Sequence, residues 1–64
     1  MVRINGEEQK VTGITVMQFL TENGYDIRRV AVELNEDILP KTQYESTFFQ
    51  DGDNVEIVSF VGGG

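Results

Sequence analysis

The stretch GITVMQFLTENG, residues 13–24, carries the clearest helix signal in this chain of 64 residues. Thr15 is a good N-cap, and Gln18 three residues later completes the sequence pattern of a capping box. Apolar residues then recur at i, i+3 and i+4 and form one stripe: Val16, Phe19 and Leu20. The pair Asn23 and Gly24 supplies a typical C-terminal stop. The stretch predicts a helix of about two turns with one buried face.

Residues 1–12, on the N-terminal side of this helix, predict a β-hairpin. The segment MVRIN alternates, because apolar Val2 and Ile4 are separated by a polar residue, as in a half-buried strand. The dipeptide Asn-Gly at positions 5 and 6 favours a tight turn, since both residues tolerate positive φ. The polar segment EEQKV would then be the return strand, at an edge of the sheet.

Residues 28–50, on the other side of the helix, predict a second strand pair and an anchored loop. RRVAVELNEDIL alternates on one face: Val30, Val32 and Leu34. A turn is expected at 35–37, and a short strand should end at Pro40, which cannot donate to a ladder. In the segment 41–50 a short helical turn would fit, and three aromatic residues are expected to anchor it to the core: Tyr44, Phe48 and Phe49.

The last predicted strand, NVEIVSFV, follows a turn at Asp51-Gly52-Asp53. Val55 and Ile57 share one face with Ser59, and the opposite face carries Glu56, Val58 and Phe60. Apolar residues on both faces indicate a central strand, or a strand with one covered face and one exposed apolar face.

The order of these elements predicts an α+β roll, in which a mixed sheet of four to five strands packs on one helix. One helix covers only one face of a sheet, so Val58 and Phe60 should lie on the open face. We expect residues 1–60 to form a single domain and residues 61–64 to form a flexible tail.

The composition argues against several classes of function. Cysteine and histidine are absent, which removes the usual zinc ligands and the commonest general base. Five basic residues face eleven acidic ones, for a net charge of -6, which disfavours nucleic acid and anionic membranes and favours an electropositive protein partner. No apolar run approaches the roughly 20 residues of a membrane span. We expect a cytoplasmic protein without a metal site.

Two local features could carry function. Arg28-Arg29 is a basic spot in an acidic chain, either solvated charge or a contact for an anion or carboxylate.

The glycines Gly62, Gly63 and Gly64 stabilise no fold, but an arm without Cβ atoms can thread a narrow channel and present its terminal carboxylate to another protein. A frayed terminus and a cloning remnant are the alternatives. No set of side chains resembles a catalytic constellation, so we do not expect an enzyme.

Beyond these local patterns, the whole chain resembles the ThiS family of sulfur carrier proteins. DGDNVEIVSFVGGG is similar to the end of that family, and VAVELNEDILPKTQYESTFFQDGD to the part before it. The INGE hairpin and the TVMQFL helix fit the same pattern. The resemblance implies a ubiquitin-like β-grasp fold.

The resemblance also implies a chemistry for the arm. Gly64 would be adenylated by an E1-like ThiF-type enzyme that consumes ATP, with no cofactor bound to this chain, and then converted to a thiocarboxylate. The thiocarboxylate would deliver sulfur for the thiazole ring of thiamin to a ThiG-type synthase, with sulfur drawn indirectly from a cysteine desulfurase. Gly62 and Gly63 would form the rest of the arm, and Val58, Phe60 and Val61 would bind partners. Alternatives are a molybdopterin-synthase small-subunit carrier, a ubiquitin-like modifier and a plain interaction domain.

Overall fold

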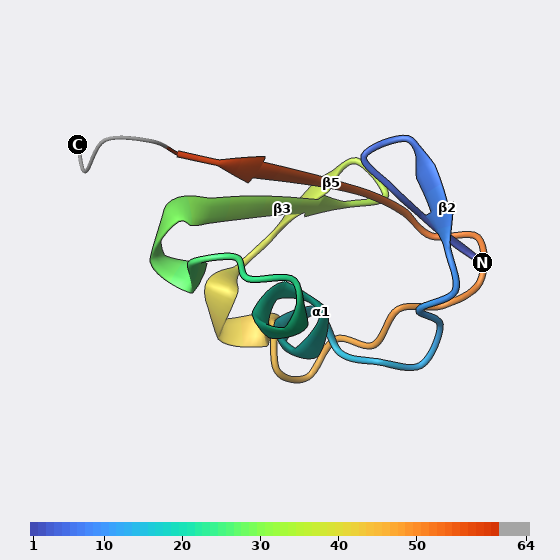
Figure 1. Ribbon diagram of the computed structural model, residues 1–64, viewed down its shortest axis with the longest axis horizontal. Helices are drawn as coiled ribbons and strands as arrows, with labels where there is room; N and C mark the ends of the chain where they lie inside the picture. Colours follow the sequence, from blue (N-terminus) through green and yellow to red (C-terminus); the bar gives the residue numbers. More distant parts are fainter. Residues whose placement is uncertain (61–64) are drawn as a thin grey trace.

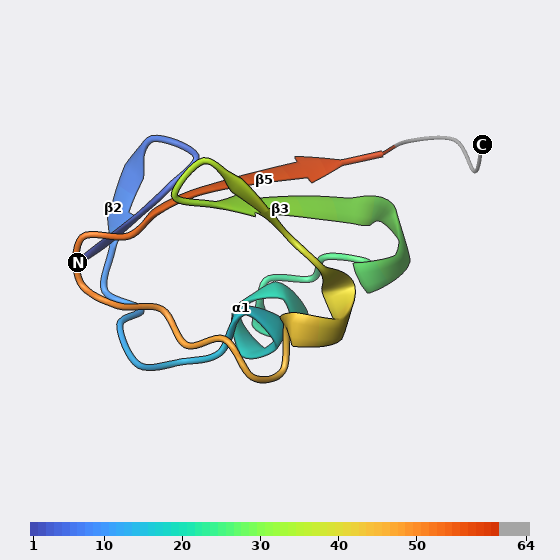
Figure 2. The same cartoon turned by 180° about the vertical axis from the view of Figure 1, so that it is seen from behind.

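Five strands form one mixed sheet in the order β2-β1-β5-β3-β4, in a computed structural model that describes residues 1–60 (Figure 1). The strands are β1 (Val2–Ile4), β2 (Glu7–Gln9), β3 (Val30–Leu34), β4 (Asp37–Leu39) and β5 (Asn54–Ser59). The helix α1 (Val16–Glu22) lies on one side of the sheet in both views (Figures 1 and 2). Two short 3-10 helices complete the fold: η1 (Ile27–Arg29) and η2 (Lys41–Gln43). The predicted α+β roll with one helix is confirmed.

The first hairpin joins β1 and β2 through a two-residue turn. Asn5 and Gly6 have φ angles of 51° and 86°, so both lie in the left-handed region that the dipeptide was expected to supply. Val2 and Ile4 are buried, and β2 is an edge strand. The predicted hairpin is confirmed, although β2 ends at Gln9 and does not include Lys10 and Val11, which were expected in the return strand.

β5 occupies the centre of the sheet. It runs parallel to β1, with Ile4 opposite Val55, and antiparallel to β3, with Val32 opposite Ile57. Both readings of the last predicted strand are confirmed: β5 is central, and it has one covered face and one face with exposed apolar side chains. Because β5 has a neighbour on each side, it joins the first hairpin to the second.

The side chain of Asn5 extends the bonding between β1 and β5 past the end of β1. Its Nδ2 donates to the carbonyl of Ile57 at 3.1 Å, and its Oδ1 accepts from the Ile57 N–H at 2.7 Å. The chain has turned away into the hairpin at this point. The side-chain amide therefore replaces the peptide group that a longer β1 would have offered.

The second hairpin joins β3 and β4 through Asn35 and Glu36, whose φ angles are 52° and 74°. The predicted turn at 35–37 is confirmed, except that Asp37 already belongs to β4. β4 ends directly before Pro40, as the missing N–H of proline requires.

Helix α1 begins and ends where its capping residues predict. Thr15 Oγ1 accepts from the Gln18 N–H at 3.0 Å, and the Asn23 side chain donates to the Phe19 carbonyl at 2.8 Å. The side chain of Gln18 donates to Glu22 at 3.3 Å. Within residues 1–60 the return bond from Gln18 to the Thr15 backbone is not formed, so the capping box is only half realised.

The core lies between α1 and one face of the sheet. Its buried side chains come from β1, α1, β3, β5 and the segment between β4 and β5: Val2, Ile4, Val16, Phe19, Leu20, Val30, Val32, Tyr44, Phe49, Val55 and Ile57. Phe19 on the helix meets Phe49 edge to face, with ring centroids 5.8 Å apart. This contact ties the loop after η2 to the helix.

The prediction that Phe48 anchors the loop to the core is wrong. Its side chain is 56% exposed, whereas Tyr44 and Phe49 are buried. Phe48 pairs with Thr15 in a short antiparallel bridge, and neighbouring side chains on extended backbone point to opposite sides. Burial of Phe49 therefore directs Phe48 outward.

Candidate functional site

The end of β5 carries two exposed apolar side chains. Val58 is 53% exposed and Phe60, directly after the strand, is 58% exposed, while Val55 and Ile57 of the same strand are buried. The alternation of side chains along β5 places the exposed pair on the sheet face opposite α1. The Phe60 N–H donates to the carbonyl of Arg29 at 2.7 Å, which fixes the chain to the start of β3 at this point.

The open face combines apolar and acidic groups. In the register of β3 and β5, Ala31 lies opposite Val58 and Glu33 lies opposite Glu56. Ile38 of β4 lies on the far side of Glu33 and is also exposed. Two carboxylates directly opposite each other repel, so this face presents negative charge beside an apolar patch. We call Val58, Phe60, Glu33, Glu56 and Ile38 the open-face patch.

The predicted sulfur-bearing residue Gly64 lies outside the described residues, as do Gly62, Gly63 and Val61. Their predicted roles therefore stay predictions. What the structure does place is the last described residue before them, Phe60, at the end of the central strand.

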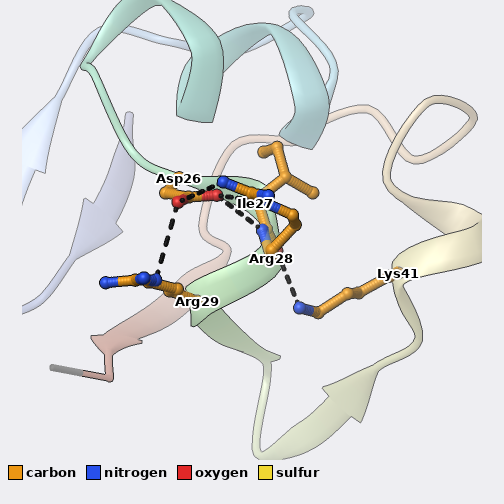
Figure 3. Close-up of polar contacts among 5 residues, drawn as sticks. All are labelled: Asp26, Ile27, Arg28, Arg29 and Lys41. Atoms are coloured by element: carbon orange, nitrogen blue, oxygen red, sulfur yellow. Dashed lines mark hydrogen bonds and ion pairs between the residues drawn. The ribbon is translucent and has the colours of Figure 1, made fainter. Parts of the chain in front are cut away.

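A group of polar side chains lies beside the same end of the sheet (Figure 3). Asp26 caps η1, accepting from the Arg28 N–H at 3.0 Å, and also accepts from the Arg28 guanidinium at 3.3 and 3.4 Å. Arg29 Nε lies 3.8 Å from the same carboxylate, and Lys41 Nζ donates to the Ile27 carbonyl at 2.7 Å. We call Asp26, Arg28, Arg29 and Lys41 the basic cluster.

Asp26 is held in its charged form by these contacts. The hydrogen bonds from the Arg28 side chain and backbone, with the nearby guanidinium charges, lower the pKa of the Asp26 carboxyl. Sequence reasoning singled out Arg28-Arg29 but missed Asp26 and Lys41. Asp26 had a local signal, since an aspartate two residues before Arg28 can cap a short turn. Lys41 had no local signal, because η2 brings it to the Ile27 carbonyl from a distant part of the sequence.

Ser46 and Thr47 are the hydroxyls of a shallow depression near Phe48, and both donate to the carbonyl of Gln43, at 3.4 and 2.7 Å. Asp53 lines the same depression, and its carboxylate oxygens accept from the Asn35 side chain at 3.0 Å and from the Gln50 N–H at 2.8 Å. Among residues 1–60 no group of three acidic side chains is placed to hold a metal ion.

Over the same residues, no helix has the length and apolar character needed to cross a bilayer.

Known proteins resemble the chain in sequence. The model of the ThiS family matches residues 2–64. The sulfur carrier protein ThiS of Thermus thermophilus is 38% identical over 64 residues, and the match covers the whole of both chains. A thiazole synthase of Paramagnetospirillum magneticum is 50% identical over 62 residues, which are 95% of this chain but 19% of that protein. The chain thus spans about a fifth of the length of this relative.

A solved structure agrees with the fold. The crystal structure of the thiamine biosynthesis protein ThiS from Geobacter metallireducens superposes with a TM-score of 0.80 at 31% sequence identity, covering 98% of this chain and 97% of that one. The β-grasp fold implied by the sequence resemblance is thereby confirmed. The family model covers almost every residue, and the fold agrees with it: this chain belongs to the ThiS family.

Proposed function

We propose that the Gly64 carboxylate is the group on which this protein's partners act. Membership of the ThiS family makes the chain a sulfur carrier protein of thiamine biosynthesis. The observation that carries the proposal for Gly64 is the family match, which extends through the glycine arm to residue 64.

The proposed chemistry takes place in two steps on the last carbonyl. A carboxylate oxygen of Gly64 attacks the α-phosphate of ATP, so that pyrophosphate leaves and an acyl-adenylate forms. A sulfur nucleophile then displaces AMP, a far better leaving group than the oxide of a free carboxylate. Sulfide gives the thiocarboxylate directly, whereas a persulfide gives an acyl disulfide that a thiol reductant must cleave to the thiocarboxylate. An arm of Gly62, Gly63 and Gly64 suits this role because it can enter a channel too narrow for side chains.

The catalytic groups belong, in this proposal, to other proteins. A ThiF-type adenylyltransferase would bind ATP and activate Gly64, and a cysteine desulfurase would be the indirect source of sulfur. This chain itself would bind no cofactor and catalyse no step, in keeping with a sequence that has neither cysteine nor histidine. We place these reactions in the cytoplasm, where ATP is available.

A ThiG-type thiazole synthase is the proposed acceptor of the sulfur. The thiazole synthase of Paramagnetospirillum magneticum contains, within one longer polypeptide, a segment half identical to this chain. Joining two partners in one chain makes their encounter intramolecular and raises their effective concentration. The occurrence of such a protein supports a direct interaction between separate carrier and synthase chains.

The open-face patch is the proposed docking surface. Val58 and Phe60 offer apolar area next to the arm, and the facing Glu33 and Glu56 carboxylates suit a partner with Lys or Arg side chains. Val61, which precedes the glycine arm, would extend the same surface. Removal of the Glu33–Glu56 repulsion on binding would add to the affinity.

Intact-mass spectrometry tests the proposal. The chain is incubated with ATP, a ThiF-type enzyme, a cysteine desulfurase, cysteine and a thiol reductant, and we expect a mass increase that corresponds to replacement of one oxygen by sulfur. A chain without Gly64 should show no change. If the full chain also keeps its mass with all components present, or if ATP is not required, the proposed chemistry is wrong.

A further inference from the structure

The basic cluster is a local excess of positive charge in a protein whose net charge is negative. Its members contribute three positive charges and one negative, a formal +2. The remaining two basic and ten acidic side chains sum to -8, which together with the cluster gives the net charge of -6. Three of the five basic residues in the chain are therefore gathered within two short 3-10 turns and their flanks.

The cluster lies at the base of the arm. Arg29 accepts the Phe60 N–H through its own carbonyl, and Val30 pairs with Ser59 at the end of β5. Both ribbon views place η1 at the end of the molecule toward which β5 points (Figures 1 and 2), and the close-up shows the cluster near that strand end (Figure 3). A protein that receives the arm must therefore approach the cluster closely.

The cationic groups are held in place but not neutralised. Arg28 is 87% exposed and Arg29 52% exposed, and the single carboxylate of Asp26 is their shared partner in the described part of the chain. An arginine side chain carries five N–H donors, of which Arg28 commits two to Asp26. Lys41 is fixed by one bond to the Ile27 carbonyl. Several donors therefore remain for an incoming anion.

We propose that the basic cluster binds carboxylate side chains on the adenylating enzyme, beside the entrance through which that enzyme takes the arm. The inference rests on the proposed function, since it assumes an enzyme that receives Gly64. Guanidinium groups suit carboxylates because they bind them in a bidentate manner. A positive pole at the arm end of a negative protein also orients the encounter, so that the arm arrives first.

Protein carboxylates fit this position better than the phosphates of ATP do. The four residues after Phe60 span up to about 13 Å when extended, at roughly 3.3 Å each. An ATP molecule that reacts with Gly64 would lie at the far end of that span. The cluster instead borders the part of the enzyme that surrounds the start of the arm.

A matched pair of charge reversals tests the proposal, with affinity for the ThiF-type enzyme measured over a series of salt concentrations. Arg28→Glu should weaken binding about tenfold at low salt, mainly through slower association, and the loss should shrink as salt rises. Lys10→Glu changes the net charge equally, but Lys10 is an exposed residue between β2 and α1. It should change the affinity less than about twofold.

Several outcomes would overturn the inference. Equal effects of the two reversals would mean that only net charge matters, and unchanged or tighter binding by Arg28→Glu would exclude an acidic docking surface. A loss seen only when ATP is present would identify phosphate as the ligand. Arg28→Gln, checked by its thermal unfolding, removes the charge without adding a carboxylate beside Asp26, and it should also weaken binding.

The failure of this inference and the failure of the proposed function can be told apart. If the wild-type chain acquires sulfur in the intact-mass assay but Arg28→Glu binds as the wild type does, only the role of the basic cluster is wrong. If the wild-type chain never acquires sulfur, the proposed function itself fails.

Discussion

The side chain of Asn5 adds two hydrogen bonds to the backbone ladder that joins β1 to β5. Asn5 has a left-handed backbone, and its amide bonds both the N–H and the carbonyl of Ile57, 52 positions away. Few residues other than glycine, asparagine and aspartate tolerate this backbone, and an amide alone among these offers both a donor and an acceptor. One side chain thus serves a hairpin turn and a parallel strand pair.

Replacing Asn5 should therefore destabilise the fold more than its exposed position suggests. Asn5→Ala should lower the free energy of unfolding by about 2 kcal/mol, since it leaves two backbone groups of Ile57 without these partners and places a Cβ-bearing residue at positive φ. Urea denaturation measures the loss. Asn5→Gly is the control that keeps the backbone conformation, so it should lose less stability than Asn5→Ala. Wild-type stability in the alanine variant would contradict the bridging role.

Asp26 makes a pH-dependent contribution to stability. Its pKa is lower in the folded chain than in the unfolded chain, chiefly through the hydrogen bond from the Arg28 side chain. A group of this kind stabilises the fold above its unfolded pKa, near 4, and this stabilisation is lost as the pH falls through the folded value.

Asp26→Asn is the matched variant for this effect, because an asparagine can still cap η1 but does not titrate. At neutral pH the wild type should be the more stable of the two, by urea midpoint. The difference should hold down to about pH 4 and shrink below it. A difference that stays constant, or grows, in acid would show that the Asp26 charge is not involved.

At the scale of elements, the pairing of β3 with β5 contains an unfavourable contact. Glu33 and Glu56 lie directly opposite each other on the open face, in a chain that already carries excess negative charge. Like charges in such a position destabilise an antiparallel pair. Basic groups of a bound partner would neutralise the two carboxylates and remove this repulsion.

Glu56→Lys should raise the stability of the free protein, by about 0.5 kcal/mol, because it turns a repulsive cross-strand pair into an attractive one. The gain should fall as salt is added. Glu45→Lys, which makes the same charge change at an exposed position outside the sheet, controls for net charge and should give a smaller gain. Equal gains in the two variants would mean that the Glu33–Glu56 contact is not itself destabilising.

Elements were predictable from the sequence where their signals are local. The alternation of Val2 with Ile4, the two left-handed turns and the capping of α1 by Thr15 each depend on a few neighbouring residues, and each was located. The pairing partners of β5 were not predictable, because the hydrophobic pattern of a central strand does not say which strands flank it. The prediction that Phe48 is buried was wrong for a related reason. Composition predicts that aromatic residues are buried, but only tertiary contacts decide which of two neighbours points inward.

For the whole molecule, the two faces of the sheet differ in how far they are buried. One face is covered by α1 and the core, while the other exposes Val58, Phe60 and Ile38. Alternation along β5 predicted the exposure of Val58 and Phe60. Of the basic cluster, the sequence predicted only the pair Arg28-Arg29. Lys41 reaches the cluster because η2 lies near η1, and no local pattern encodes that approach.

Phe60→Ser should weaken binding to the partner enzymes about tenfold, while the melting temperature changes little, because the side chain is largely exposed in the free protein. Phe48→Ser is a matched control, as Phe48 is exposed to nearly the same degree but lies on the loop before β5. It should bind as the wild type does. Equal binding losses in both variants, or a large loss of stability in Phe60→Ser, would contradict a docking role for Phe60.

The central place of β5 has a consequence for how the chain is made in the cell. A ribosome delivers the β1–β2 and β3–β4 hairpins first, and neither hairpin has a partner strand until residues 54–59 emerge. Until then β1 and β3 each keep an unpaired edge, which is a hazard for aggregation. The five-stranded sheet can therefore form only after residues 54–59 have emerged, so the order of synthesis leaves both hairpins waiting for the same strand.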